Sequence, residues 1–262
     1  AAATQNGVAV AEPVITLTDA YGNVTTGTGS AKVIAGDYKL SVSDGGHNRT
    51  DGTLTVSADA QVSVTLPYGE WFGNIRLLDA EKEPYRFKQN QADHTAQYWI
   101  EDTGNALSSV YLNAAMGNVP DTKTTKLRTI YTGTNGKDMS NLARSWNSTA
   151  TSLTYLLAAG MEGKTFALEA QYAGADGYTQ IQSYDVTVTR VPTLKTLTAT
   201  AEGTKLPLDF EPTVREYSLT TVSSTLEIAA EPFGEDYTVT GTGTVQLTGD
   251  TQDHTVQVTA PN

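Results

Sequence analysis

Histidines are the first residues to consider for chemistry, because imidazole serves both as an acid–base group and as a metal ligand. The 262-residue chain has three, and they are far apart: His47, His94 and His254. None has a second histidine or a carboxylate two to four positions away on a plausible shared face, except His254, which is near Asp250 and Asp253. We therefore expect exposed turn histidines without a metal-binding or acid–base role. The sequence also lacks the Gly-x-Ser-x-Gly, His-Glu-x-x-His and phosphate-loop patterns of common hydrolases and nucleotide-binding proteins.

Carboxylates are the second candidates, since glycoside hydrolysis needs two of them at a fixed separation. Glu101 and Asp102 are adjacent on an expected strand, so their side chains would point to opposite faces and could not act on one bond. Glu81 and Glu83 fall in an expected turn. We therefore expect no catalytic residue, no metal site and no cofactor, and the chain is predicted not to be an enzyme.

Four residues remain as candidates for ligand binding: Trp99, Trp146, Lys126 and Arg128. If both neighbours of Trp99 face a core, the period of two along a strand places Trp99 on the outer face. A tryptophan there needs a cover, such as a helix that carries Trp146, or a ligand. Lys126 and Arg128 belong to a small basic stretch in a threonine-rich loop or hairpin, and such a stretch usually forms a solvated face.

The elements that must position these residues are β-strands. Apolar residues make up 39% of the chain, and β-branched residues alternate with polar ones in short runs bounded by Gly, Asp and Asn. There is no cysteine, so hydrophobic cores must stabilise the fold without disulfides. A chain of this length suffices for two or three domains. The expected fold class is all-β, with three tandem antiparallel β-sandwich modules.

The charge of the chain bears on its partners. A net charge of −12 disfavours nucleic acids and anionic membranes. No apolar run is long enough for a transmembrane helix, so we expect no membrane insertion in this segment.

Residues 1–67 are predicted to form the first module. Their strand-like runs are short and separated by turn residues. The Gly36-x-Tyr-x-Leu-x-Val run, a glycine-rich turn and further strands that end at Leu66-Pro67 resemble the prealbumin-like modules of bacterial surface proteins. The resemblance implies an immunoglobulin-like or prealbumin-like sandwich.

Residues 68–190 are predicted to form an elaborated second module. All three tryptophans and all three methionines fall there. Met139, Leu142, Ala143 and Trp146 have the spacing of one helical face, and Asp138 before them is a suitable N-cap. We expect one short helix at this point, inserted between strands.

Residues 191–262 resemble the cadherin-like β-sandwich module of bacterial cell-surface proteins, and residues 68–190 are a looser copy. The matching residues are Leu194-x-x-Leu-Thr, Phe210-x-Pro-x-Val-x-x-Tyr217, Leu226-Glu-Ile-Ala-Ala and the run from Gly249 to Ala260. Such modules normally end with a strand of the form Tyr-x-Val-x-Val-Thr-Arg, which the chain has at Tyr184–Arg190. The last module lacks this strand within the given sequence, so either the natural protein continues or the sandwich is completed in another way.

The resemblance implies a surface location and no activity of its own. Calcium is not expected, because the junction Val188-Thr-Arg-Val-Pro-Thr contains no carboxylate. The predicted function is that of a non-enzymatic, extracellular, monomeric spacer and adhesion region of a bacterial surface protein, whose partner is a protein or glycan on a cell surface. A carbohydrate-binding module and an accessory region of a larger secreted enzyme are the alternatives.

Overall fold

The computed structural model describes residues 1–79, 81–103, 111–121, 125–130, 146–147, 152–156 and 165–261. Within these ranges the chain is made of strands and contains no helix, which confirms the all-β fold class. The chain forms two compact units: unit 1 comprises residues 1–98 and 108–188, and unit 2 comprises residues 99–107 and 189–262. Two long strands, β10 (Thr95–Glu101) and β16 (Thr179–Val191), begin in unit 1 and end in unit 2.

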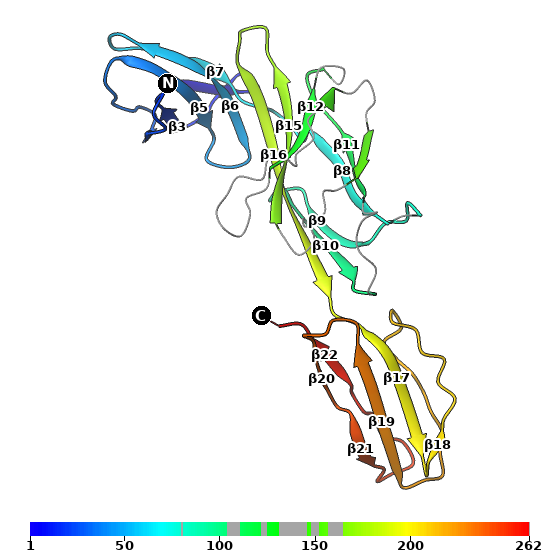
Figure 1. Ribbon diagram of the computed structural model, residues 1–262. Helices are drawn as coiled ribbons and strands as arrows, with labels where there is room; N and C mark the ends of the chain where they lie inside the picture. Colours follow the sequence, from blue (N-terminus) through cyan, green and yellow to red (C-terminus); the bar gives the residue numbers. More distant parts are fainter. Residues whose placement is uncertain are drawn as a thin grey trace. The chain divides into compact units, whose positions relative to one another are not determined.

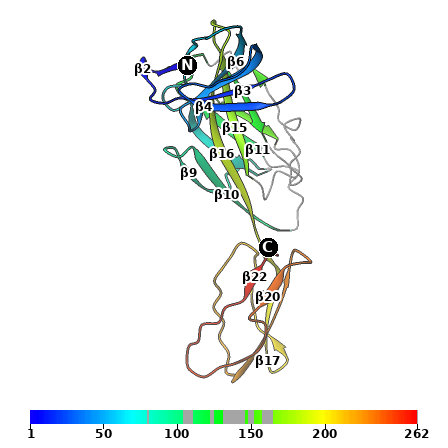
Figure 2. The ribbon, with the colours of Figure 1, turned by 90° about the vertical axis from the view of Figure 1, so that its left-hand side faces the viewer.

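The N-terminal part of unit 1 consists of seven strands (Figures 1 and 2). They are β1 (Ala2–Gln5), β2 (Val8–Ala9), β3 (Val14–Thr18), β4 (Val24–Thr28), β5 (Gly36–Ser43), β6 (Asn48–Val56) and β7 (Ser63–Thr65). Because apolar residues alternate with polar ones, each central strand buries one face. Ile15, Leu17, Leu40 and Val42 pack in one core with Leu66, all at 4% exposure or less.

In its described residues, the second part of unit 1 adds seven more strands. They are β8 (Phe72–Leu78), β9 (Arg86–Asn90), β11 (Tyr111–Met116), β12 (Lys126–Ile130), β13 (Trp146–Asn147), β14 (Ser152–Leu156) and β15 (Thr165–Ala173). Strands β14, β11 and β8 form one sheet, while β13, β12, β15 and β16 belong to a ten-stranded sheet that continues through β6, β5, β3 and β4. Ile75, Leu77, Leu112 and Ala114 are completely buried.

The ten-stranded sheet crosses the predicted boundary at residue 67. Strand β6 pairs with β16 in antiparallel register, from Asn48 opposite Gln182 to Asp51 opposite Thr179. Gln182 is itself buried and accepts a hydrogen bond of 2.7 Å from the backbone N–H of Trp71. Residues 1–67 and the following segment are thus joined within one unit, and their division into two modules stays a prediction.

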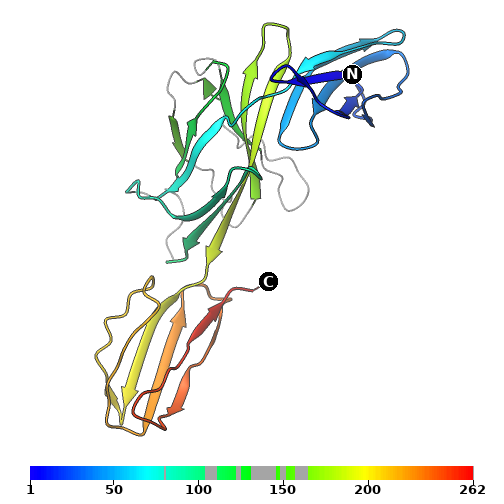
Figure 3. The same cartoon turned by 180° about the vertical axis from the view of Figure 1, so that it is seen from behind.

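Unit 2 has two smaller sheets. One contains β18 (Thr204–Lys205), β17 (Leu194–Ala201), β19 (Thr225–Pro232) and β21 (Gly243–Gln246), in that order, and the other contains β20 (Thr238–Thr240) and β22 (Gln257–Thr259). Figure 3 shows β17 (yellow) beside β19 (orange), its neighbour in the larger sheet. Only Leu194, Ala199, Ala201 and Ile228 are buried apolar residues in the part of residues 189–262 that the structure describes.

Two predictions about local structure concern residues 68–190. The helix predicted over Met139–Trp146 lies outside the described residues except for Trp146, which is on strand β13. The basic stretch, predicted as a loop or hairpin, includes strand β12, which pairs along its whole length with β15. The alternation of Lys126, Leu127 and Arg128 explains the strand, because Leu127 is buried at 1% exposure.

Candidate functional site

Three of the four predicted ligand-binding residues come together on neighbouring strands. Lys126 lies opposite Asn147 and Leu127 lies opposite Trp146 in the pairing of β12 with β13. Arg128 follows on the same strand, opposite Glu169 of β15. Lys126 is exposed, whereas the side chain of Arg128 retains 34% of its accessible surface. Lys126 is therefore the basic side chain on this strand that is open to a ligand.

Arg128 is held by an ion network that extends across the sheet. Its Nη2 and Nε atoms lie 2.6 and 2.7 Å from Oε2 of Glu169, which also accepts a hydrogen bond from Gln171. Arg49 of β6 contacts the other carboxylate oxygen, Oε1, at 2.7 Å, and also pairs with Asp51 at 3.2 Å. Glu169 is buried at 1% exposure. Because a buried charge without a partner is costly, both arginines are required to compensate its negative charge.

The charges in this network offset the cost of burying Arg49. Burial alone would lower the pKa of the Arg49 guanidinium, but the negative charges of Glu169 and Asp51 outweigh that effect, and the net shift is upward. Arg128 and Arg49 thus serve mainly to neutralise Glu169.

Trp99 belongs to unit 2, whereas the other three candidates belong to unit 1. Its neighbours Tyr98 and Ile100 are buried at 0 and 1% exposure, and Trp99 itself is half-buried. The alternation along β10 is the one that the sequence predicted.

Two histidines that the sequence places far apart meet in unit 1. The rings of His47 and His94 stack with their centroids 4.9 Å apart, and Tyr184 stacks on His94 at 5.4 Å. His47 lies in the turn between β5 and β6, and His94 lies in the turn between β9 and β10. The side chain of His94 is only 13% exposed, so the prediction of an exposed turn residue is wrong for this histidine. His254, in contrast, is exposed, and its Nε2 lies 2.7 Å from the carbonyl oxygen of Gly241.

Both ring nitrogens of His94 face oxygen acceptors. Nδ1 lies 3.0 Å from the carbonyl oxygen of Ser183, and Nε2 lies 3.3 Å from the carboxylate of Glu70. The residues His47, Glu70, His94 and Tyr184 are called here the histidine cluster. Among the residues that the structure describes, no group of three or more side chains is placed to hold a metal ion.

The adjacent carboxylates Glu101 and Asp102 have separate partners in unit 2. Glu101 pairs with Arg215 at 2.5 Å. Asp102 is buried at 7% exposure, lies 3.5 Å from Arg190 and accepts a hydrogen bond of 2.6 Å from the hydroxyl of Tyr237. Burial, together with this carboxylate, raises the pKa of Tyr237. The two acids thus serve different ion pairs, as the alternation along a strand predicts for neighbours.

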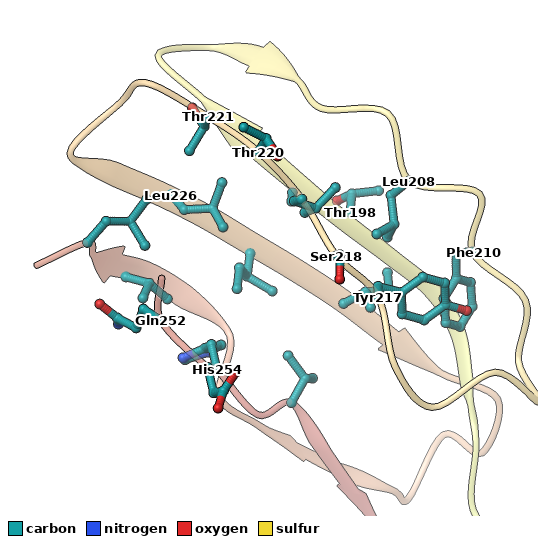
Figure 4. Close-up of a pocket in the computed structure, with 18 of the residues that line it drawn as sticks. Thr198, Leu208, Phe210, Tyr217, Ser218, Thr220, Thr221, Leu226, Gln252 and His254 are labelled. Carbon is teal, nitrogen blue, oxygen red and sulfur yellow. The ribbon is translucent and has the colours of Figure 1, made fainter. Parts of the chain in front are cut away.

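A large hollow lies inside unit 2. It has a volume of about 820 Å³ and is lined by both sheets and by the segment that connects β18 to β19. Apolar side chains such as Leu197, Leu226 and Val258 line it together with polar ones such as Gln252 and His254. Figure 4 shows Gln252 and His254 on one segment of the lining and Ser218 and Thr220 on another.

The histidine cluster and the Glu169 network were not foreseen from the sequence. The sequence gives no local signal for either, because their members come from strands and turns that are distant in the chain. The residues next to Glu169 do not reveal its burial: Leu168 and Ala170 are both completely buried, and period two places Glu169 on the opposite face of the strand.

The chain was compared with known proteins at three levels. Models of protein families, curated proteins and solved structures gave no match. Among the described residues, no helix is long and apolar enough to span a membrane.

Proposed function

We propose that the chain is a non-enzymatic, extracellular spacer and adhesion region of a bacterial surface protein. One observation carries the proposal: strand β16 ends at Val191, and β17 of the next sheet begins at Leu194, so that only Pro192 and Thr193 intervene. Thr193 is completely buried, and its hydroxyl donates a hydrogen bond to the carbonyl oxygen of Asp102. A connection of this kind differs from the exposed, polar linkers that usually join independent domains.

The surface chemistry supports a protein or glycan as the partner. The net charge of −12 disfavours nucleic acid. Lys126 is exposed on β12 and is not part of the Glu169 network, so it can bind an acidic group without loss of an internal ion pair. We propose that this strand contributes to adhesion and that the chain acts as a monomer.

The proposal can be tested with beads that carry the whole chain. Their retention under flow would be measured on surfaces coated with host glycoproteins or oligosaccharides, and the coating would be checked afterwards by mass spectrometry. We expect retention without chemical change of the coating. Lys126→Ala should reduce retention several-fold, whereas the matched variant Lys39→Ala, at an exposed position of β5, should leave it unchanged.

The alternatives give different results. Inhibition by a free oligosaccharide, with loss of retention in Trp99→Phe, would favour a carbohydrate-binding module. Turnover of the coating would contradict a non-enzymatic role. Absence of retention on every surface would contradict adhesion.

A further inference from the structure

The hollow inside unit 2 contrasts with the tightly packed core of unit 1. In unit 1, inward apolar residues such as Ile75 and Leu112 are completely buried. In unit 2, Leu219 and Val258 lie between exposed neighbours, as inward residues do, yet these two residues and Leu226 remain half-exposed. They line the hollow of about 820 Å³, so a substantial apolar area faces space that no side chain of the described chain fills.

Two extended segments border this hollow without completing a sheet. In residues 216–222, half-buried Tyr217, Leu219 and Thr221 alternate with exposed Ser218 and Thr220. This is the pattern of a strand with one buried face, but the described residues give the segment no ladder partner. Its backbone N–H and C=O groups can therefore pair with another chain.

The second border is formed by β22 and the residues that lead into it. Strand β22 pairs with β20 along one edge, and the described residues provide no strand along its other edge. Val256 and Val258 line the hollow from this side, and so do Gln252 and His254. The hollow is thus bordered on two sides by strand-like backbone and lined by apolar side chains.

The charged residues at the rim of the hollow indicate which charge a bound segment would carry. Asp250 and Asp253 are both exposed and both line the hollow. Arg215, the arginine of the lining, already pairs with Glu101. A basic side chain would complement the two free acids.

We propose that this hollow binds one further β-strand, an extended segment of a second polypeptide that has apolar side chains at alternate positions and a basic residue near one end. The bound strand would pair with the edge of β22 or with residues 216–222 and would bury the half-exposed apolar residues. This site is separate from Lys126 and does not depend on the adhesive role proposed for β12.

Strand β16 shows what such a segment looks like in this protein. Its inward residues Tyr184, Val186 and Val188 are exposed by 0, 0 and 1%, and they fill a core of the same chain. Arg190 follows at the end of the strand. A synthetic peptide with the sequence of residues 183–191 is therefore a rational probe for the hollow.

The experiment titrates the labelled peptide with the whole chain and follows fluorescence anisotropy. We expect saturable binding, and at least tenfold weaker binding of a control peptide with serine at the three inward positions. The paired variant Asp250→Asn/Asp253→Asn, at exposed positions, should weaken binding of the peptide about threefold to tenfold. It should not weaken binding of a peptide that carries Arg190→Gln, because the basic partner is then absent.

Hydrogen exchange locates the bound peptide independently. Residues 216–222 and 250–259 should gain protection when the peptide is added, while β5 should not. Equal binding of the two peptides, or protection outside these segments, would overturn the proposal. So would occupation of the hollow by an apolar dye that the peptide fails to displace, or self-association of the chain that excludes the peptide.

Discussion

Glu169 illustrates how one buried charge organises residues from three strands. It neutralises Arg49 and Arg128 at 2.7 and 2.6 Å and is buried at 1% exposure. Glu169→Gln would leave two arginines without their common partner, and we expect the free energy of unfolding to fall by roughly 2–3 kcal/mol, less than for a fully buried pair because both arginines are about one-third exposed. Urea-induced unfolding would measure this change.

The matched control for this prediction is Asp51→Asn. The side chain of Asp51 is 36% exposed and lies at the outer end of the Glu169 network. A surface pair of this kind contributes less than about 1 kcal/mol. Equal losses in the two variants would show that burial of Glu169 does not determine the size of the effect.

The buried Tyr98 leads us to predict that unit 1 loses stability at alkaline pH. Its hydroxyl is buried and donates a hydrogen bond of 2.6 Å to the carbonyl oxygen of Ile75. Burial raises the pKa of Tyr98, an effect that the charge of Arg76 only partly offsets. Above about pH 10 the unfolded chain loses this proton and the folded chain retains it, so stability should fall as the pH rises.

Substitution by phenylalanine separates this effect from packing. Tyr98→Phe should lower stability by about 1 kcal/mol at neutral pH, because a buried carbonyl loses its donor, and it should reduce the alkaline loss. Tyr21→Phe is the control, since the Tyr21 side chain is 92% exposed and forms no part of a core. If Tyr98→Phe left the loss of stability at alkaline pH unchanged, that loss could not be attributed to Tyr98.

At the scale of elements, the pairing of β6 with β16 depends on a glycine. Gly52 lies on β6, and a methyl group at this position would overlap the ring of Tyr178, which packs against the N-terminal core from the turn before β16. Gly52→Ala should therefore displace Tyr178 and destabilise unit 1 by roughly 1–3 kcal/mol. The control is Gly73→Ala on β8, where the nearest atom would be an ordinary 3.9 Å away. Thermal unfolding would compare the two, and equal effects would exclude a specific role of the Tyr178 ring.

Local patterns in the sequence predicted the strands but not their long-range partners. The period of two along β10 predicts that Trp99 lies on the face opposite to Tyr98 and Ile100, which are both buried. Leu127, which is buried between two basic residues of β12, follows the same rule. The contact of His47 with His94 depends on Ser183 of β16. The carbonyl oxygen of Ser183 lies 3.0 Å from Nδ1 of His94, and its backbone N–H donates to the carbonyl oxygen of His47. Such contacts follow from the order of strands in a sheet, which alternation within one strand does not specify.

At the scale of the whole molecule, two units with separate cores should unfold in separate steps. The core of unit 1 contains completely buried Ile75 and Leu112, whereas the buried apolar residues of unit 2 include Ile228 at 8% exposure beside a hollow of about 820 Å³. Because hydrophobic stabilisation grows with the apolar area removed from water, unit 2 should unfold first. Hydrogen exchange in increasing urea should show that the amides of β19 lose protection before those of β11.

Two core substitutions should assign these steps to the units. Ile75→Ala should shift only the later transition, by roughly 2–5 kcal/mol, because it creates a cavity in a closely packed core. Ile228→Ala should shift only the earlier transition, and by less, because its side chain already borders empty space. A single transition that moves with both substitutions would show that the strands shared by the units, β10 and β16, couple them into one cooperative structure.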